Sequence, residues 1–148
     1  MKNNNEIKKL NNKGFSLVEL IIVIAIMAVL IGVLAPQYLK YVEKSRISSD
    51  KDNVSAVVSA LTVYGADPDA TLAFADGDKI TLGRSSSTYT TDGNGAAAQA
   101  LASANITLPT LTNKQTFDTV EISVAVNATT HAITVTTVYK NGATVVNP

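Results

Sequence analysis

The side chains that most often carry out chemistry in proteins are sparse in this sequence. His131 is the only histidine and cysteine is absent, which removes thiolate nucleophiles, thiolate metal sites and most histidine-based zinc sites and catalytic triads. His131 also falls in a predicted loop between two strands, where an exposed ring is the ordinary finding. The sequence therefore indicates no catalytic set, metal site or cofactor site, and predicts a protein that is not an enzyme.

Acidic residues cluster in the middle of the chain, at Asp67, Asp69, Asp76 and Asp78. Clustered carboxylates can bind Ca²⁺, but this spacing does not match an EF-hand loop. Aspartate beside proline or glycine is typical of turns, and we interpret the cluster as turns. The run Asp92-Gly93-Asn94-Gly95 lacks the lysine and the strand-to-helix context of a phosphate loop, so it too is interpreted as a turn.

One carboxylate stands apart because it lies at the start of a long apolar run. Leu20 to Ala35 are sixteen residues without a polar side chain, and Glu19 directly precedes them. A carboxylate inside a membrane segment costs about 2.5 to 3.5 kcal/mol at the centre of the bilayer, and less near its edge. Glu19 therefore needs a partner, unless its side chain merely reaches back to the membrane surface.

The apolar run is long enough to cross a membrane once. Leu17 to Ala35 are nineteen residues, and as a helix they span about 28 Å. Residues 1–14 hold four lysines against one acid, which would keep that end in the cytoplasm. A conventional signal peptide is an alternative, but its only candidate cleavage site, Val33-Leu34-Ala35, is followed by Pro36, whose rigid ring suits a protease cleft badly.

The segment Gly14-Phe15-Ser16-Leu17-Val18-Glu19 resembles the processing signature of type IV prepilins and of the pseudopilins of type II secretion and competence systems. In that family a membrane peptidase cuts after the glycine, the new N-terminal phenylalanine is N-methylated, and the glutamate directs assembly. The resemblance implies these roles for Gly14, Phe15 and Glu19. The cut would expose an amine that Glu19 of a neighbouring subunit could neutralise, and breaking such a buried pair typically costs about 3 to 5 kcal/mol.

A second helical segment follows Pro36. Val54, Val57, Val58 and Leu61 recur at offsets of zero, three, four and seven, which predicts an amphipathic helix whose apolar face packs on the head. A helix over 15–64 would be about 75 Å long. The residues between the two apolar stretches form a mixed-charge zone, interpreted as a solvated face or, alternatively, as contacts between filament subunits. They are Glu43, Lys44, Arg46, Asp50, Lys51 and Asp52.

A break in this long helix is predicted at Gly32 to Pro36. Proline removes a backbone donor and glycine lowers helix propensity, so the helix should bend or melt there. Many family members carry a helix-disrupting proline at the position of Pro36. A simple kink of a membrane helix is the alternative.

The remaining chain, residues 65–148, is predicted to form a small head. Its first part is a loop region to Gly95 with one short strand, followed by a short helix at 96–104. Alternating apolar residues predict an antiparallel hairpin of 120–126 with 133–139, and a turn at Asn141-Gly142 leads to a third strand at 143–146. The fold class is α+β, and a long helical spine on a three- or four-stranded antiparallel sheet is the pilin fold that the resemblance implies.

Four regions follow from this organisation: a cleaved basic leader (1–14), a hydrophobic transmembrane and assembly helix (15–36), its amphipathic continuation (37–64) and the head (65–148). The resemblance implies a major pilin, anchored once in the cytoplasmic membrane and then polymerised into an extracellular helical filament for adhesion, aggregation or motility. The expected partners are membrane lipid before assembly, prepilin peptidase, the pilus assembly platform and other copies of the chain.

Two other functions stay open. One is a pseudopilin or minor pilin of a type II secretion or competence system. The other, of a different class, is a single-span surface binding protein that never polymerises. Nucleic acid is not expected as the main partner, because twelve basic residues balance twelve acidic ones.

Overall fold

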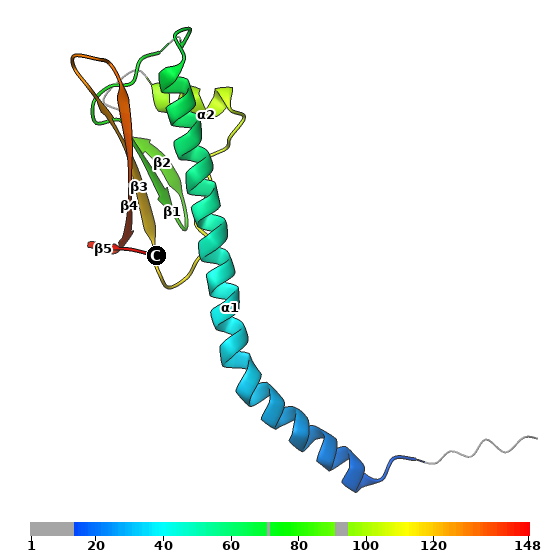
Figure 1. Cartoon of the computed structure of the whole chain (residues 1–148). Helices are drawn as coiled ribbons and strands as arrows, with labels where there is room; N and C mark the ends of the chain where they lie inside the picture. The colour runs from blue at the N-terminus through cyan, green and yellow to red at the C-terminus, as the bar shows by residue number, and fades with distance from the viewer. Residues whose placement is uncertain (1–13, 71, 91–94) are drawn as a thin grey trace, which may run out of the picture. The chain divides into compact units, whose positions relative to one another are not determined.

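The computed structural model describes residues 14–70, 72–90 and 95–148. It divides into two compact units between Leu39 and Lys40. Helix α1, Leu17–Ala66, contributes to both units. The described residues of the first unit are the first part of this helix and the three residues before it, whereas the second unit contains a sheet and a second helix (Figure 1).

Helix α1 is continuous through Gly32 and Pro36, so the helix is not melted there in the single chain, and the bend predicted as the alternative to melting stays a prediction. Pro36 lacks the N–H that would bond the carbonyl of Gly32 four residues earlier, but this removes a single hydrogen bond. The apolar residues on either side keep their own hydrogen bonds, which is enough to hold the helix in the single chain. Loosening of the helix at this place in a filament stays a prediction.

The second unit is built on a five-stranded antiparallel sheet in the order β2-β1-β3-β4-β5 (Figure 1). Its elements are β1 Lys79–Gly83, β2 Ser87–Thr90, α2 Ala96–Ser103, β3 Thr119–Val126, β4 Ile133–Asn141 and β5 Thr144–Val146. The predicted hairpin is confirmed, since β3 pairs with β4 along its whole length, from Thr119↔Lys140 to Val126↔Ile133. The third strand is confirmed as β5, which follows a turn at Gly142 with φ of 59°.

The predicted strand number of three or four is wrong, because β2 was missed. Strand β2 is four residues long and pairs only with β1, at the edge of the sheet. Its sequence, Ser-Thr-Tyr-Thr, carries no apolar alternation because only Tyr89 is large and apolar, and Tyr89 is 39% exposed. This strand forms because its backbone pairs with β1, and not because it buries an apolar face.

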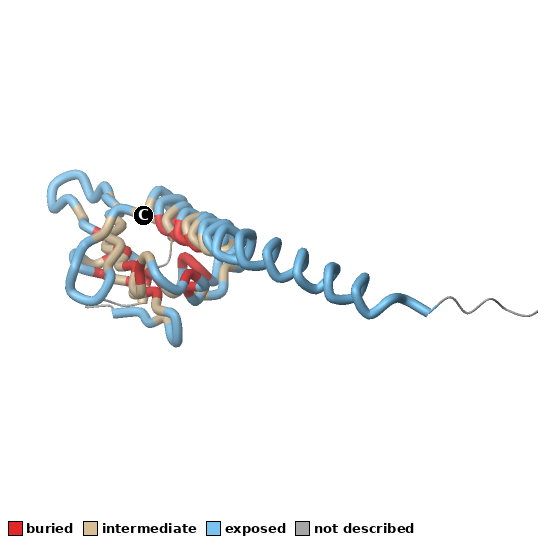
Figure 2. Tube along the Cα trace, turned by 90° about the horizontal axis from the view of Figure 1, so that it is seen from below, coloured by how far each residue is buried: buried red, intermediate tan, exposed pale blue. Residues whose placement is uncertain are grey.

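The core of the second unit lies between α1, α2 and one face of the sheet (Figure 2). On α1, Val54, Val57 and Leu61 are at most 2% exposed, and Val58 is partly buried against the same core. The sheet supplies the alternate residues of β1 and β3, and α2 supplies its alanine face. These residues are Ile80, Leu82, Val120, Ile122 and Val124 from the sheet, and Ala96, Ala97, Ala100 and Leu101 from α2. The architecture is the expected α+β fold.

A buried carboxylate ties α1 to the loop that leads into β3. Asp50 is fully buried, and its two oxygens accept hydrogen bonds from the backbone N–H and side chain of both Thr112 and Asn113, at 2.8 to 3.1 Å. Burial acts to raise the pKa of Asp50, but the hydrogen bonds from Asn113 and Thr112 outweigh it and hold this pKa below its ordinary value. The interpretation of Asp50 as part of a solvated face is therefore wrong.

A second carboxylate, two helical turns earlier, holds the same loop. Glu43 Oε1 accepts the backbone N–H groups of Lys114 and Gln115, at 2.6 and 2.9 Å. From the opposite side, Arg84 donates to the carbonyl of Phe117 at 2.7 Å. The ring of Phe117 is fully buried, with its centroid 5.0 Å from that of Tyr139. We call residues 111–118 the anchored loop, because these contacts attach it to both helix and sheet.

We predict that replacing Asp50 by Asn destabilises a fragment of residues 40–148 by about 3 kcal/mol at neutral pH, because buried donors lose their acceptor. Because the pKa of Asp50 lies below its ordinary value of 3.8 in the folded state, its ionised form stabilises the fold at pH values above 3.8. This stabilisation is lost as the pH falls through the pKa of the folded state. The loss of stability between about pH 5 and pH 2 should thus be smaller in Asp50→Asn.

Urea unfolding of the fragment, followed by circular dichroism, measures both effects. The exposed Asp52, two residues away on the same helix, supplies the matched control. Its replacement by Asn should change the stability by less than about 0.5 kcal/mol. Equal effects at the two positions would contradict an anchoring role for Asp50.

Candidate functional site

The Gly14–Phe15 bond lies in a segment without helix or strand structure, immediately before α1. Phe15 is 93% exposed, and a Cβ placed on Gly14 would meet nothing within 4 Å. Packing against the described residues thus gives no reason for a glycine at position 14. A small residue there suits an external pocket, such as that of a protease, and the bond is accessible to one. The rest of the predicted leader, residues 1–13, lies outside the described residues.

Glu19 lies in the first turn of α1 and folds back onto the start of the helix. Its Oε2 accepts the backbone N–H of Ser16 at 2.9 Å, while the carbonyl of Ser16 accepts the N–H of Leu20 at 3.2 Å. Ser16 is thus the N-cap and Glu19 supplies the glutamate half of a capping box. The sequence interpretation missed this role, although the Ser-x-x-Glu spacing signals it.

The capping contact uses one carboxylate oxygen of Glu19, so the other can accept a further hydrogen bond. Within the described part of the chain, Glu19 Oε1 accepts no hydrogen bond from the protein. The negative charge also lies near the helix N-terminus, where the helix dipole favours an anion. Glu19 can therefore keep its own helix capped with one oxygen and offer the other to a cation from outside.

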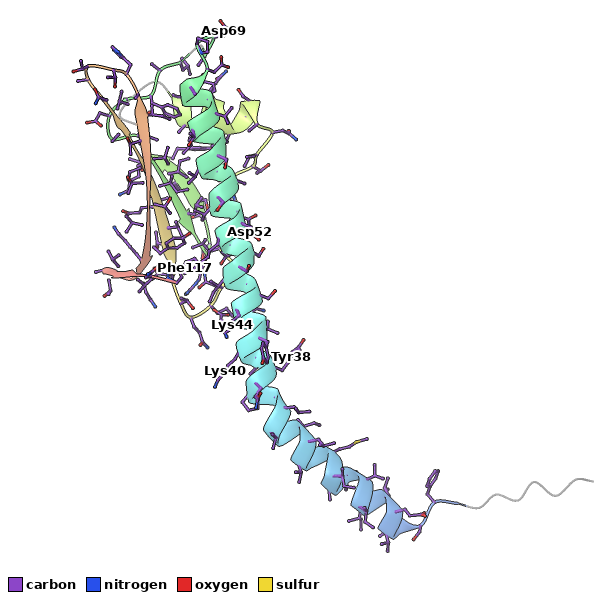
Figure 3. The ribbon with its side chains drawn as sticks, viewed as in Figure 1. Tyr38, Lys40, Lys44, Asp52, Asp69 and Phe117 are labelled. Carbon is purple, nitrogen blue, oxygen red and sulfur yellow. The ribbon has the colours of Figure 1, made fainter. Side chains whose placement is uncertain are left out.

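The apolar segment that follows is exposed around its whole circumference. Every residue from Leu17 to Leu39 is exposed (Figure 2), and Tyr38, 68% exposed, lies near its end (Figure 3). Among the described residues, α1 is long and apolar enough to cross a membrane. A helix that is apolar on all sides requires lipid or other apolar helices around it.

The acidic residues of the loop region do not converge on one point. Asp67 accepts the N–H of Asp69 at 2.9 Å, and Asp76 and Asp78 accept other backbone N–H groups at 3.1 and 3.0 Å. The contacts of Asp67 and Asp78 are local turn contacts, which fits their interpretation as turns, although Asp78 is fully buried; Asp76 instead accepts the N–H of Val126 at the end of β3. His131 is exposed in the β3–β4 loop. Asp92, Gly93 and Asn94 lie outside the described residues.

Two comparisons with known proteins find similarities that include this N-terminal segment or part of the chain. The model of the prokaryotic N-terminal methylation motif matches residues 9–35. The type IV major pilin protein PilA of Myxococcus xanthus (strain DK1622) is 34% identical over 65 residues, which are 44% of this chain and 30% of that relative. No solved structure matches the chain.

The motif, the relative and the α+β fold with an apolar N-terminal helix agree with one another. The chain therefore carries the N-terminal methylation motif and, over less than half of its length, is similar to a type IV major pilin. Because the match spans less than a third of the relative's length, the activity of that whole protein is not transferred from it.

We predict that Gly32→Ala and Pro36→Ala reduce the amount of filament while leaving the amount of membrane-inserted chain unchanged. A Cβ at Gly32 meets nothing within 4 Å, so the single chain accommodates it. Both changes make the helical conformation more favourable, by about 1 kcal/mol for the glycine and about 3 kcal/mol for the proline relative to alanine. Immunoblots of sheared filaments and of membranes measure the two pools, with Val33→Ile as control. Wild-type filament amounts in both variants would contradict a loosened segment in the filament.

Proposed function

We propose that this chain is the precursor of a major pilin, the repeating subunit of a type IV pilus. The observation that carries the proposal is the order of three features: an accessible Gly14–Phe15 bond, a carboxylate in the first turn of α1, and a fully exposed apolar helix. Prepilin peptidase would cut between Gly14 and Phe15, and Phe15 would then be N-methylated.

Before assembly, the apolar half of α1 would lie in the cytoplasmic membrane, surrounded by lipid. The lysines of residues 1–14 would hold the N-terminus on the cytoplasmic side until the cut removes them. The assembly platform would then move the subunit from lipid into the base of a filament. There, the apolar surface exchanges lipid for the same surface of other copies, so it stays out of water throughout.

The pairing of charges would select the position of each new subunit. The cut converts the backbone nitrogen of Phe15 into a cationic amine, and Glu19 of an incoming copy can accept it with the oxygen that does not cap its own helix. An unpaired carboxylate inside the apolar bundle is strongly unfavourable, so a subunit without this contact is rejected. This role needs no catalytic group, and we infer that the protein is not an enzyme.

Similarity to the type IV major pilin PilA supports a major pilin over a pseudopilin or minor pilin. The complete signature, with Glu19 present, agrees with an abundant subunit. A membrane-anchored binding protein that does not polymerise would have no use for a cleavable leader or for a carboxylate at the start of its anchor.

Variants of Glu19 in the full-length chain test the proposal. Glu19→Gln keeps an oxygen that can cap the helix but removes the charge, while Glu19→Ala removes both. We expect both variants to be cut after Gly14 and to accumulate in membranes, with filament amounts lowered at least about tenfold, because a lost buried ion pair costs about 3 to 5 kcal/mol. Filaments at wild-type level from Glu19→Gln would show that the charge is dispensable and would contradict the pairing.

A further inference from the structure

Charge is distributed unevenly between the two ends of the second unit. One end contains residues 40–52 of α1, the β1–β2 turn at 84–86 and the anchored loop, and we call it the basal end. Hydrogen bonds join these segments, because Glu43 accepts the N–H of Lys114 and Arg84 donates to the carbonyl of Phe117. Basic residues outnumber acidic ones at this end by six to four. They are Lys40, Lys44, Arg46, Lys51, Arg84 and Lys114, against Glu43, Asp50, Asp52 and Asp118.

The opposite end of the unit is acidic. It contains the C-terminal end of α1 and the loop that precedes β1. Its described acids are Asp67, Asp69, Asp76 and Asp78. Lys79, the next residue, contacts Glu121 of the sheet at 3.0 Å. Figure 3 shows Asp69 at this end, and Lys40 and Lys44 at the other. The unit is thus basic where the chain enters it from the apolar segment, and acidic at the far end.

Three lysines of the basal end lie close together on its surface. Lys40 and Lys44 are one helical turn apart on α1, and Lys114 lies beside the same turn, because its N–H is 2.6 Å from Oε1 of Glu43. All three are exposed, and among the residues that the structure describes none of their ammonium groups forms an ion pair. We call these three residues the basal lysine cluster.

The cluster follows the apolar run at the depth of lipid headgroups. Along the helix, Lys40 lies about 8 Å beyond Ala35, the last residue of that run, and Lys44 about 14 Å beyond it. The headgroup layer on each side of a bilayer is about 5 to 8 Å thick. The Cα–Cβ bonds of a helix tilt toward its N-terminus, so both lysine side chains lean back toward the apolar run. Their ammonium groups are therefore within reach of the phosphate layer.

Two tyrosines mark the same depth. Tyr38 and Tyr41 are 68% and 67% exposed, although their rings are largely apolar. They lie about 5 and 9 Å beyond Ala35 along the helix. Tyrosine is enriched at membrane–water interfaces, because its ring is buried beside the acyl chains while its hydroxyl stays among the headgroups. The tyrosines thus indicate, independently of the lysines, that this part of α1 lies in the headgroup layer.

We propose that the basal lysine cluster binds the phosphate groups of anionic phospholipids and so docks the head on the membrane surface before assembly. This inference rests on the proposed function, because it requires the apolar segment to cross a bilayer. Chain connectivity then holds the basal end next to the lipid, whatever the angle between the two units. The acidic far end is repelled by the same surface, so the docked head has one orientation.

The docked state is reversible, as a subunit that later leaves the membrane requires. Each lysine near an anionic surface strengthens binding by about fivefold, and three lysines by about a hundredfold. Such binding is enough to keep most heads docked, and it weakens when salt screens the charges. The docked head fixes how deeply the apolar segment lies, and with it the depth of Glu19 in the bilayer.

A fluorescent label beside the cluster tests the docking in the full-length chain. The chain has no cysteine, so Gln115→Cys gives a single labelling site next to Lys114 in the anchored loop. The labelled protein is reconstituted into vesicles in which a few lipids carry a nitroxide quencher on the headgroup. We expect strong quenching in vesicles of phosphatidylglycerol and phosphatidylcholine, and weak quenching in phosphatidylcholine alone or at high salt. Equal quenching in the two kinds of vesicle would overturn the inference.

Neutral variants in the same labelled chain identify the residues. Lys40→Gln/Lys44→Gln/Lys114→Gln should lower the ratio of docked to undocked heads about a hundredfold, and Lys44→Gln alone about fivefold. Lys79→Gln is the matched control, because it removes the same charge from the sheet and should leave the quenching unchanged. Equal losses from Lys44→Gln and Lys79→Gln would indicate a general effect of net charge and would overturn the role of the cluster.

A label at the far end and flotation of the vesicles separate the remaining outcomes. Asp69→Cys places the label at the acidic end, where we expect no quenching in either kind of vesicle, and quenching as strong as at position 115 would overturn a defined orientation. A chain that floats with the vesicles while its label at position 115 stays unquenched would overturn the docking and leave the proposed function standing. A chain that does not float with them would instead overturn the membrane anchoring on which the proposed function depends.

Discussion

The apolar first half of α1 cannot remain in water, and this constraint explains most other features of the chain. Leu17 to Leu39 are all exposed, so no described residue of the single chain covers them. Lipid covers such a surface during insertion, and copies of the same helix can cover it afterwards. In the proposed function, the basic residues before the helix and the carboxylate at its first turn are the polar groups that would control when this exchange takes place.

The second half of α1 serves a different purpose within the same helix. It packs the head on one side through Val54, Val57 and Leu61, and it holds the anchored loop through Asp50 and Glu43. A chain without cysteine cannot attach this region by a disulfide. Hydrogen bonds donated to the carboxylates of Asp50 and Glu43 hold this loop without a covalent link, and the lowered pKa of Asp50 makes the stability of the head sensitive to acid.

Much of this organisation could be predicted from local patterns. Alternation of apolar and polar residues predicted β3 and β4, and the spacing of Val54, Val57 and Leu61 predicted the face of the helix that packs on the head. The edge strand β2 and the burial of Asp50 could not be predicted, because both depend on residues distant in the chain. Strand β2 exists through pairing with β1, and Asp50 is buried because Thr112 and Asn113 reach it across 62 and 63 residues. The capping role of Glu19 is local and was visible as Ser-x-x-Glu.

The N-terminal residue and mass of the chain in sheared surface filaments test the central claim most directly. A subunit that starts at Phe15, with the mass of one added methyl group, in material that sediments as a filament, is the result the account predicts. A chain that still begins at Met1, or one cut after Ala35 and found free in solution, would contradict it, since neither form could use the amine of Phe15 and the carboxylate of Glu19 to assemble.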